Sequence, residues 1–308
     1  MRGSLTFQHT LGLRVSMAFF TPQHAYLIGI DSDGCVFDSM ELKHKECFIP
    51  NFIRSYGLQA VSKYAREAAE FVNLYSKRRG TNRFLALVEQ LEWLSRRPEV
   101  KARGCAAAVP AGLAEWTKRE SKLGHPSLEK AIADTGDHDL KQAYDWSQAV
   151  NRSVAEMVHD LPPFPRVRDC LNRFATTADM IVCSQTPQVA LDAEWQEHDL
   201  ACYVHAICGQ ERGTKQQILK EAAKNYAPEK TLMIGDAPGD LSAAVANQCL
   251  FFPINPGQEE ASWQRLFDEG IDRFFGGTFA GNYQRILIDE FESLLPERPP
   301  WPVDDNNL

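Results

Sequence analysis

Five short apolar runs along the chain have the pattern of buried strands. One covers 26–30, a weaker one covers 203–208, and the other three cover 180–183, 231–234 and 250–254. A continuous apolar run of roughly four to eight residues is typical of a strand that is covered on both faces of a sheet. Helical patterns separate the later runs. This alternation of strands and helices predicts an α/β fold with a doubly wound parallel sheet.

A long insertion separates the first of these runs from the second. Roughly 140 residues lie between them, whereas a crossover between parallel strands needs little more than one helix. Apolar positions recur in this segment at spacings of three and four, which predicts a mostly helical structure. The predicted helices cover 58–75, 81–94 and 140–161, and two prolines end the last of them.

These patterns divide the chain into two predicted domains. We expect an α/β core made of 1–38 and 165–308, and an inserted helical domain over 39–164. After the last strand, the pattern of 263–295 predicts two more helices. The Pro-rich segment 296–302 predicts a surface tail.

The composition predicts a folded protein without a nucleic-acid partner. The 308 residues are 44% hydrophobic and 24% charged, which excludes a disordered chain. The net charge is -8 and no segment clusters lysine and arginine, so we expect no nucleic-acid partner. No apolar stretch approaches the roughly 20 residues that span a bilayer, so we predict no transmembrane helix and no membrane partner.

The N-terminal segment and the cysteines predict a cytoplasmic protein. Residues 1–24 lack the basic start, the compact apolar block and the cleavage site of a signal peptide, and Met17 is a second candidate start. The eight cysteines are scattered along the chain and none forms a CxxC pair. We therefore expect reduced thiols in a cytoplasm.

Two aspartates follow the first predicted strand directly. Asp31 and Asp33 are two residues apart in an extended segment, so their side chains point to the same side. Gly34 lets the backbone turn sharply, and Asp38 completes the pattern Asp-x-Asp-Gly-x-x-x-Asp. A calcium-binding helix-loop-helix is excluded, because it needs a preceding helix and a glycine at the sixth loop position. The carboxyl end of a parallel strand is where open α/β sheets bind ligands.

A candidate anion site follows the run 180–183. Ser184 and Gln185 come directly after this strand and precede Thr186-Pro187, a pair that is typical of a helix start. A serine hydroxyl together with free amides at a helix N-terminus can hold phosphate oxygens without adding charge. A strand that ends in serine is common, so this signal alone is weak.

Two more carboxylates and a lysine complete the set of candidate site residues. Asp236 and Asp240 follow the strand 231–234 at a helix entry, where Asp240 alone is also a suitable N-cap. An N-cap does not explain Asp236 at the strand end. Lys215 precedes an amphipathic helix, and only its position in the chain order distinguishes it from a surface lysine.

In chain order, these four groups resemble the four sequence motifs of the haloacid dehalogenase superfamily of phosphotransferases. Their order, spacing and location at strand ends agree over about 24–38 and 165–255, and the insert stands where that family places its cap domain. The resemblance implies a Rossmann-like core with a helical cap. The cap sequence and the C-terminal extension over 257–308 lie beyond what it explains.

The resemblance also implies a role for each motif residue. Asp31 would be the nucleophile that forms an aspartyl-phosphate, and Asp33 would protonate the leaving oxygen and later take a proton from water. Because nearby carboxylates raise the pKa of a carboxyl group, we expect Asp33 to be protonated near neutral pH. Lys215 would neutralise the phosphoryl group and Asp31. The implied phosphate-binding residues are Gly34, Ser184, Gln185 and Lys215.

Mg²⁺ is the implied cofactor, because all the candidate ligands are hard oxygen atoms. By the resemblance, Asp31 and Asp236 would bind it through their carboxylates and Asp33 through its backbone carbonyl. Asp240 would lie beside them as a ligand or as a support. Lys43 and His44 follow the first motif closely and are candidates for contacts between the cap and the substrate.

We therefore predict a Mg²⁺-dependent phosphatase that hydrolyses a small phosphorylated metabolite. The aspartate at position 33 disfavours the family branches that cleave carbon–halogen or carbon–phosphorus bonds. A sugar-phosphate mutase stays open as the alternative, although this chain has Lys43, followed by His44, where a mutase carries its cap-linked histidine. A non-catalytic phosphate-binding protein is less favoured, since it would be expected to lack Asp31, Asp33 or Asp236. The sequence predicts neither the substrate nor the oligomeric state.

Overall fold

The computed structural model describes residues 20–105 and 107–304. The predictions that concern residues 1–19, namely the absence of a signal peptide and the second start at Met17, lie outside this part. All eight cysteines are free, which agrees with the predicted reduced thiols. No helix within the described residues combines the length and the hydrophobicity of a membrane span.

Five parallel strands form one sheet in the described part of the chain, in the order β3-β2-β1-β4-β5. They are β1 (Tyr26–Ile30), β2 (Ala178–Cys183), β3 (Ala206–Cys208), β4 (Thr231–Gly235) and β5 (Leu250–Pro253). The order reverses at β1, which pairs with β2 on one side and β4 on the other. The predicted Rossmann-like, doubly wound sheet is confirmed. Its topology brings the carboxyl ends of β1, β2 and β4 next to one another, at the switch point where such sheets bind ligands.

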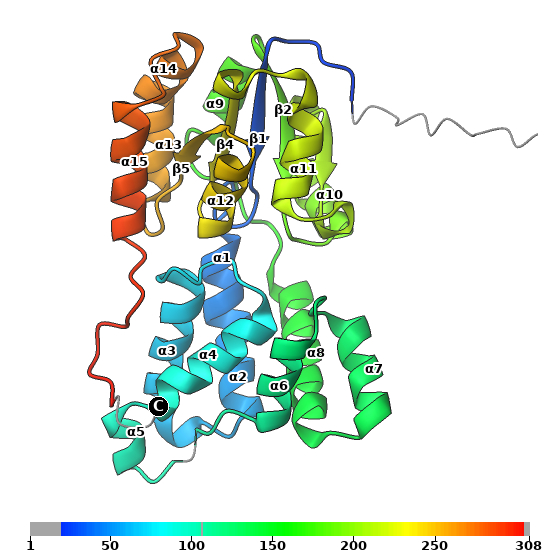
Figure 1. Cartoon of the computed structure of the whole chain (residues 1–308), viewed down its shortest axis with the longest axis vertical. Coiled ribbons are helices and arrows are strands. Elements are labelled where there is room, and N and C mark those ends of the chain that lie inside the picture. The colour runs from blue at the N-terminus through cyan, green and yellow to red at the C-terminus, as the bar shows by residue number, and fades with distance from the viewer. Residues whose placement is uncertain (1–19, 106, 305–308) are drawn as a thin grey trace, which may run out of the picture.

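Alternate strand residues feed two hydrophobic layers, with helices on both faces of the sheet (Figure 1). Ile28, Met180 and Ile234 belong to the layer formed with α9 (Val167–Phe174), α10 (Gln188–Glu197), α13 (Glu259–Arg265) and α14 (Ile271–Phe275). Leu27, Ile181 and Met233 belong to the layer formed with α11 (Lys215–Ala222), α12 (Pro238–Ala246) and α15 (Asn282–Ser293). Burial on both faces explains why the strands are continuously apolar in sequence.

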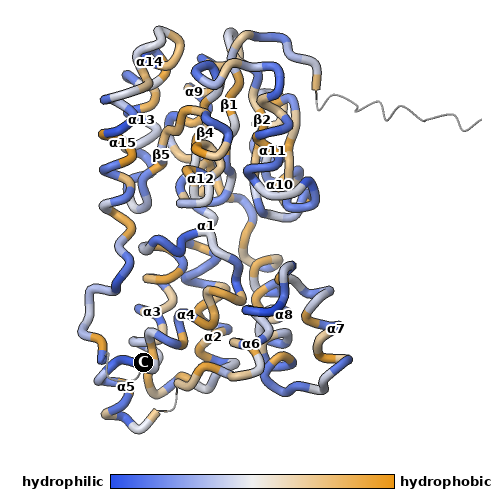
Figure 2. Tube along the Cα trace, viewed as in Figure 1, coloured by the Kyte–Doolittle hydropathy of each residue, from blue (hydrophilic) through white to orange (hydrophobic). Residues whose placement is uncertain are grey.

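The segment between β1 and α9 is helical and lies beyond the carboxyl ends of the strands (Figure 1). A hydrophobic cluster inside it includes Trp116 and Trp146 and is separate from the clusters of the sheet. Figure 2 shows this division, with apolar stretches on β4 and β5 and again along α2 and α4. The helices are α1 (Ser39–Leu42), α2 (Ile49–Ser55), α3 (Ser62–Leu74), α4 (Arg83–Ser95), α5 (Pro98–Ala102), α6 (Ala111–Arg119), α7 (His125–Thr135) and α8 (His138–Met157), with a π-helical segment at Lys43–Phe48.

Helix α8 ends earlier than its apolar pattern predicts. The side chain of Asp137 caps its start by accepting hydrogen bonds from the N–H groups of Asp139 and Leu140. Its last residue is Met157 rather than Leu161. Val158 has a φ of -96° and a ψ of 84°, which lies outside the helical region, so the helix stops before the prolines are reached.

The C-terminal segment connects the core to the helical insert. Two helical stretches follow β5, as predicted: α13 to α14, joined by a π-helical turn, and then α15. The chain after α15 runs back along the molecule to the insert (Figure 1). There the Trp301 ring lies 5.6 Å from the Phe71 ring, and the guanidinium of Arg97 lies 4.4 Å from the centre of the Trp301 ring. The Pro-rich end is therefore attached to the insert, which the prediction of a surface tail did not anticipate.

Candidate active site

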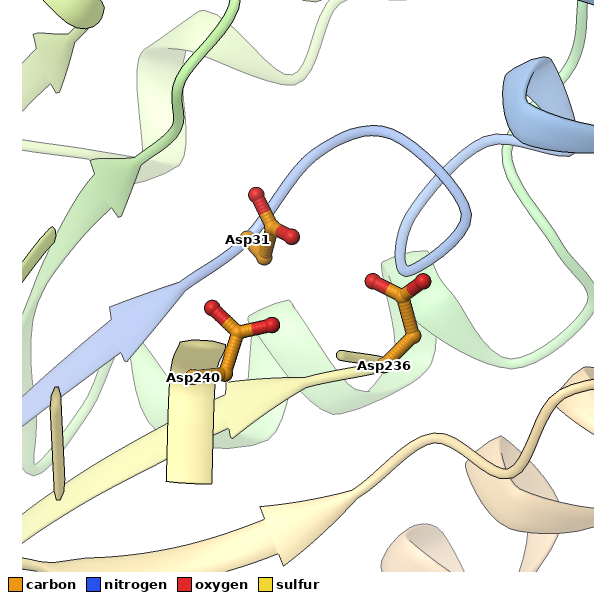
Figure 3. Close-up of side chains that lie close together, drawn as sticks. All are labelled: Asp31, Asp236 and Asp240. Carbon is orange, nitrogen blue, oxygen red and sulfur yellow. The ribbon is translucent and has the colours of Figure 1, made fainter. Parts of the chain in front are cut away.

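Three buried aspartates meet where β1 and β4 end (Figure 3). Asp31 follows β1, Asp236 follows β4, and Asp240 lies in the first turn of α12. One carboxylate oxygen from each residue lies within 4.8 Å of those of the other two. The parallel strand order thus brings together carboxylates that are about 200 residues apart in the sequence.

Lys215, at the first position of α11, joins this cluster. Its Nζ lies 2.5 Å from Asp31 Oδ2 and 2.7 Å from Asp240 Oδ1. Burial disfavours the charged ammonium, but Asp240 and Asp31 raise the pKa of Lys215 above its usual range, so the side chain stays protonated. Asp240 Oδ2 also accepts a hydrogen bond from the N–H of Ala237 at 3.1 Å, so this aspartate stabilises the start of α12 as well.

The cluster carries more negative charge than its neighbours neutralise. Burial raises the pKa of Asp236 to about 8, and the nearby Asp31 and Asp240 add to this rise although Arg79 opposes it. Burial likewise raises the pKa of Asp240 to about 7, against the effect of Lys215. Crowded buried carboxylates of this kind take up protons or a cation.

The donor set fits a divalent metal ion. Asp236 Oδ1 is buried and has no hydrogen-bond partner, so it is available as a ligand. One carboxylate oxygen from each of Asp31, Asp236 and Asp240 lies within 4.8 Å of the other two, close enough for one ion to contact all three. Carboxylate oxygens are hard donors, which suit hard divalent cations. These three residues can therefore hold a metal at the end of the sheet.

Asp33 lies outside the three-aspartate cluster and is held by other partners. Its Oδ1 accepts hydrogen bonds from Ser39 Oγ and Lys43 Nζ, both at 2.5 Å, and its Oδ2 accepts one from Thr186 Oγ1 at 2.6 Å. Burial alone would raise the pKa of Asp33, but Lys43 and the three hydrogen bonds lower it to about 2. The expected protonated Asp33 is therefore wrong for this arrangement, because its charged partner is a lysine and not a carboxylate.

The segment after β2 is arranged differently from the expected anion site. Ser184 is buried, and its Oγ accepts a hydrogen bond from the N–H of Thr186 at 3.2 Å. Gln185 Nε2 donates to a backbone oxygen of the loop before α11 at 3.0 Å. Thr186 does not cap α10, because the N-cap position is Pro187 and no side chain caps this helix, while the Thr186 hydroxyl donates to Asp33 Oδ2. The N–H of Gln188 donates to Glu211, so this amide at the helix start is already used.

The two candidates from the insert lie in different surroundings. Lys43 reaches the first motif through its contact with Asp33. The ring of His44 lies 4.6 Å from that of Phe48, with Nδ1 buried and without a hydrogen-bond partner. Burial and the cations Arg79 and Lys43 lower the pKa of His44 to about 3, so it is neutral. Lys43 therefore lies at the site, whereas the His44 side chain packs inside the insert.

Arg79 is a functional candidate that the sequence analysis missed. It lies between α3 and α4, is 3% exposed, and its Nε donates to Asp236 Oδ2 at 2.7 Å. In the sequence it follows Lys77 and Arg78 directly, and only the adjacent Gly80, at a helix end, sets it apart. The contacts of Ser39, the first residue of α1, and Thr186 with Asp33 were also missed, because a single hydroxyl residue carries no pattern that identifies its partner.

Glu194 on α10 is a second missed residue, close to the first motif. Its Oε2 accepts a hydrogen bond from Ser32 Oγ at 3.0 Å, and Ser32 Oγ also accepts one from Trp195 Nε1 at 3.0 Å. Burial raises the pKa of Glu194 to about 7, with a contribution from Asp33. Two hydrogen bonds with α10 thus hold Ser32, the residue between Asp31 and Asp33, in place.

The sequence was compared with protein families, with curated proteins and with solved structures. A model of the haloacid dehalogenase-like hydrolase family matches residues 27–247, which include every site residue described above. A solved structure of a haloacid dehalogenase-like family hydrolase from Streptococcus pneumoniae is 13% identical, with a TM-score of 0.42 over 78% of this chain and 90% of that chain. A HAD-superfamily hydrolase of subfamily IA, variant 1, from Geobacter sulfurreducens is 16% identical, with a TM-score of 0.39 over 76% and 89%. No curated protein matches the sequence.

Proposed function

The chain belongs to the haloacid dehalogenase-like hydrolases, and from this membership we propose that it is a Mg²⁺-dependent phosphatase for a small phosphorylated metabolite. The contact of Lys215 with both Asp31 and Asp240, beside Asp236, carries the proposal. This contact brings the candidate nucleophile Asp31, the cation Lys215 and the carboxylate oxygens that can bind a metal into one buried site. In this proposal residues 39–164 form the domain that covers the site and excludes water.

The reaction would proceed in two displacements at phosphorus. A carboxylate oxygen of Asp31 attacks phosphorus while the bond to the ester oxygen breaks, and Asp33 gives the departing oxygen its proton. Water then attacks the phosphorus of the aspartyl-phosphate, Asp33 takes one proton from it, and phosphate leaves with Asp31 restored. Since Lys43 favours ionised Asp33, the first step requires that Lys43 leaves Asp33 when the substrate binds.

The remaining motif residues would position the reacting groups. Bound Mg²⁺ would supply positive charge that stabilises the phosphoryl oxygens. Asp31 and Asp236 would hold it by carboxylate oxygens and Asp33 by its backbone carbonyl, with Asp240 beside them. Lys215 keeps Asp31 in place, and the Ser184 hydroxyl is available to donate to a phosphoryl oxygen. Phosphoryl transfer depends mainly on positioning and charge stabilisation, so this small set suffices.

The environment of His44 gives the mutase alternative no support. A mutase needs a histidine that can exchange protons near the nucleophile, whereas His44 packs on Phe48 and burial lowers its pKa to about 3. The eight free cysteines support a cytoplasmic location, and the net charge of -8 supports a partner other than nucleic acid.

Phosphate release from p-nitrophenyl phosphate and from a panel of metabolite phosphates tests the proposal. We expect turnover with Mg²⁺, none with EDTA, and none for Asp31→Asn, while the exposed control Asp289→Asn stays as active as the wild type. Turnover that persists in EDTA or in Asp31→Asn would contradict the mechanism. A wild type that is inert on the whole panel would contradict the phosphatase assignment.

A further inference from the structure

Arg79 is a buried cation that the helical insert places in the core. Its Nε and Nη2 lie 2.7 Å and 2.6 Å from the same oxygen, Asp236 Oδ2, and its Nη1 donates to the backbone oxygen of Leu74 at 3.0 Å. The last contact anchors the guanidinium to the end of α3. The insert and the core therefore share one ion pair in the aspartate cluster.

The guanidinium of Arg79 has more donors than acceptors around it. Arginine carries five N–H groups. If each of the three contacts uses one of them, two remain without an acceptor among the described residues, on a side chain that is 1% exposed. Buried donors that lack acceptors cost free energy. This imbalance points to a ligand that brings oxygen atoms to Arg79.

The Nη2 end of this guanidinium, which contacts Asp236, lies against the loop of the nucleophile. A Cβ atom added to Gly34 would lie 2.6 Å from Arg79 Nη2 and 2.7 Å from Asp236 Oδ2. Gly34 therefore leaves space for the ion pair three residues after Asp31. Lys215 contacts Asp31 and Arg79 contacts Asp236, so two cations from different parts of the chain meet the same group of aspartates.

The two oxygens of Asp236 have separate environments. Oδ2 faces Arg79, whereas Oδ1 is buried and has no hydrogen-bond partner. A cation can therefore use Oδ1 without displacing the guanidinium. The planar fork of an arginine matches two oxygens of a phosphate better than a lysine does.

We propose that Arg79 is a catalytic residue that the insert supplies, and that its free N–H groups bind non-bridging oxygens of the phosphoryl group. This inference rests on the proposed phosphatase function and adds a residue to its site. Charge builds up on these oxygens during phosphoryl transfer, so a guanidinium beside them lowers the barrier. Because Arg79 belongs to the insert, the site is complete only when the insert lies on the core.

Binding of inorganic phosphate in the presence of Mg²⁺, measured by calorimetry, tests this role separately from turnover. We expect Arg79→Gln to weaken phosphate binding by about 10-fold or more, and to lower kcat/KM for p-nitrophenyl phosphate by about 100-fold. Arg79→Lys keeps the charge without the fork and should lose less of both. The control is Arg78→Gln, since Arg78 is an exposed neighbour that pairs with Glu89 and should behave as the wild type.

The results separate a catalytic role from a merely structural one. If both Arg79 variants fold and keep phosphate affinity and kcat/KM within twofold of the wild type, Arg79 only joins the insert to the core and the inference is overturned. If Arg79→Gln does not fold, the same comparison on Arg79→Lys decides. A wild type that binds phosphate through Arg79 but hydrolyses no ester would overturn the phosphatase proposal and leave the phosphate-binding role of Arg79 supported.

Discussion

Lys215 Nζ lies 2.5 Å from Asp31 Oδ2, which joins the start of α11 to the end of β1. A capping box sets the start of this helix. Thr214 Oγ1 accepts a hydrogen bond from the N–H of Gln217 at 3.2 Å, and Gln217 Oε1 accepts one from the N–H of Thr214 at 2.9 Å. Local sequence therefore positions Lys215, and its charge then orients the candidate nucleophile.

Replacing Lys215 with methionine removes this charge while keeping much of the side-chain volume. We expect kcat to fall by about 100-fold or more, because the cation that holds Asp31 and stabilises phosphoryl oxygens is lost. Steady-state kinetics with p-nitrophenyl phosphate measures this loss. Lys220→Met, at an exposed position of the same helix, serves as the control and should keep full activity. A Lys215→Met enzyme with more than a third of the wild-type kcat would contradict the assigned role.

Gly34→Ala should be more destabilising than an ordinary substitution at a positive φ. Gly34 has a φ of +72°, and an added Cβ would lie 2.6 Å from Arg79 Nη2. Gly57 has a φ of +65° with no atom within 4 Å of an added Cβ, so Gly57→Ala measures the backbone cost alone. We expect a loss in unfolding free energy of about 1 kcal/mol for Gly57→Ala and of about 3 kcal/mol or more for Gly34→Ala. If chemical denaturation gave equal losses of unfolding free energy for the two variants, the Arg79–Asp236 ion pair would be able to move away from the added Cβ at no cost.

Glu194 gives the stability a dependence on pH. Its pKa is raised to about 7 in the folded protein, chiefly by burial, against 4.5 as the ordinary value. A raised carboxyl pKa means that the folded state binds the proton more tightly than the unfolded state. The resulting stability is fully present below about pH 4.5 and is lost as the pH rises to about 7.

Glu194→Gln should remove this loss, because glutamine stays neutral and its oxygen can still accept the hydrogen bond from Ser32. We expect the variant to match the wild type near pH 4.5 and to exceed its unfolding free energy by about 3 kcal/mol at pH 8. Urea denaturation at several pH values measures the difference. The exposed Glu229→Gln should follow the wild type throughout. A constant difference between Glu194→Gln and the wild type across this range would argue against the titration of Glu194.

The parts of the fold that the sequence predicted well are those in which local pattern and burial coincide. The strand 26–30 was predicted with its observed bounds, because both of its faces are covered and every residue of the run is apolar or glycine. The weaker run 203–208 was predicted too long. Only Ala206–Cys208 pairs with β2, and Ala201–Tyr203 forms a 3-10 turn instead.

The candidate site likewise has residues that the sequence predicted together and residues that it did not predict. Asp31, Asp236 and Asp240 were expected together, because ends of neighbouring parallel strands meet whatever the connections between them. Arg79 was not expected, because its position depends on how the insert packs on the core. The hydrophobic periodicity of the sequence does not predict this packing. The same dependence explains the wrong expectation for the pKa of Asp33, whose neighbour Lys43 comes from the insert.

Trp301 should stabilise the insert although it lies in the C-terminal tail. Its ring packs on Phe71 of α3, and Arg97 stacks on it, while the N–H of Asp304 donates to the backbone oxygen of Arg96 at 3.0 Å. Trp301→Ala removes the central contact of this attachment. We expect a loss of about 2 kcal/mol, smaller than for a fully buried tryptophan because Trp301 is partly exposed.

Hydrogen exchange shows where this loss occurs. Without the ring, the tail should detach, and the amides of α3 and α5 should exchange faster, while those of β1 and β4 should keep the wild-type rate. Trp301→Phe retains an aromatic face for Phe71 and Arg97, so it should recover most of the protection. If exchange in α3 and α5 is unchanged in Trp301→Ala, the tail only rests on the insert, and the connection between core and insert depends on the buried contacts around Arg79 and Lys43.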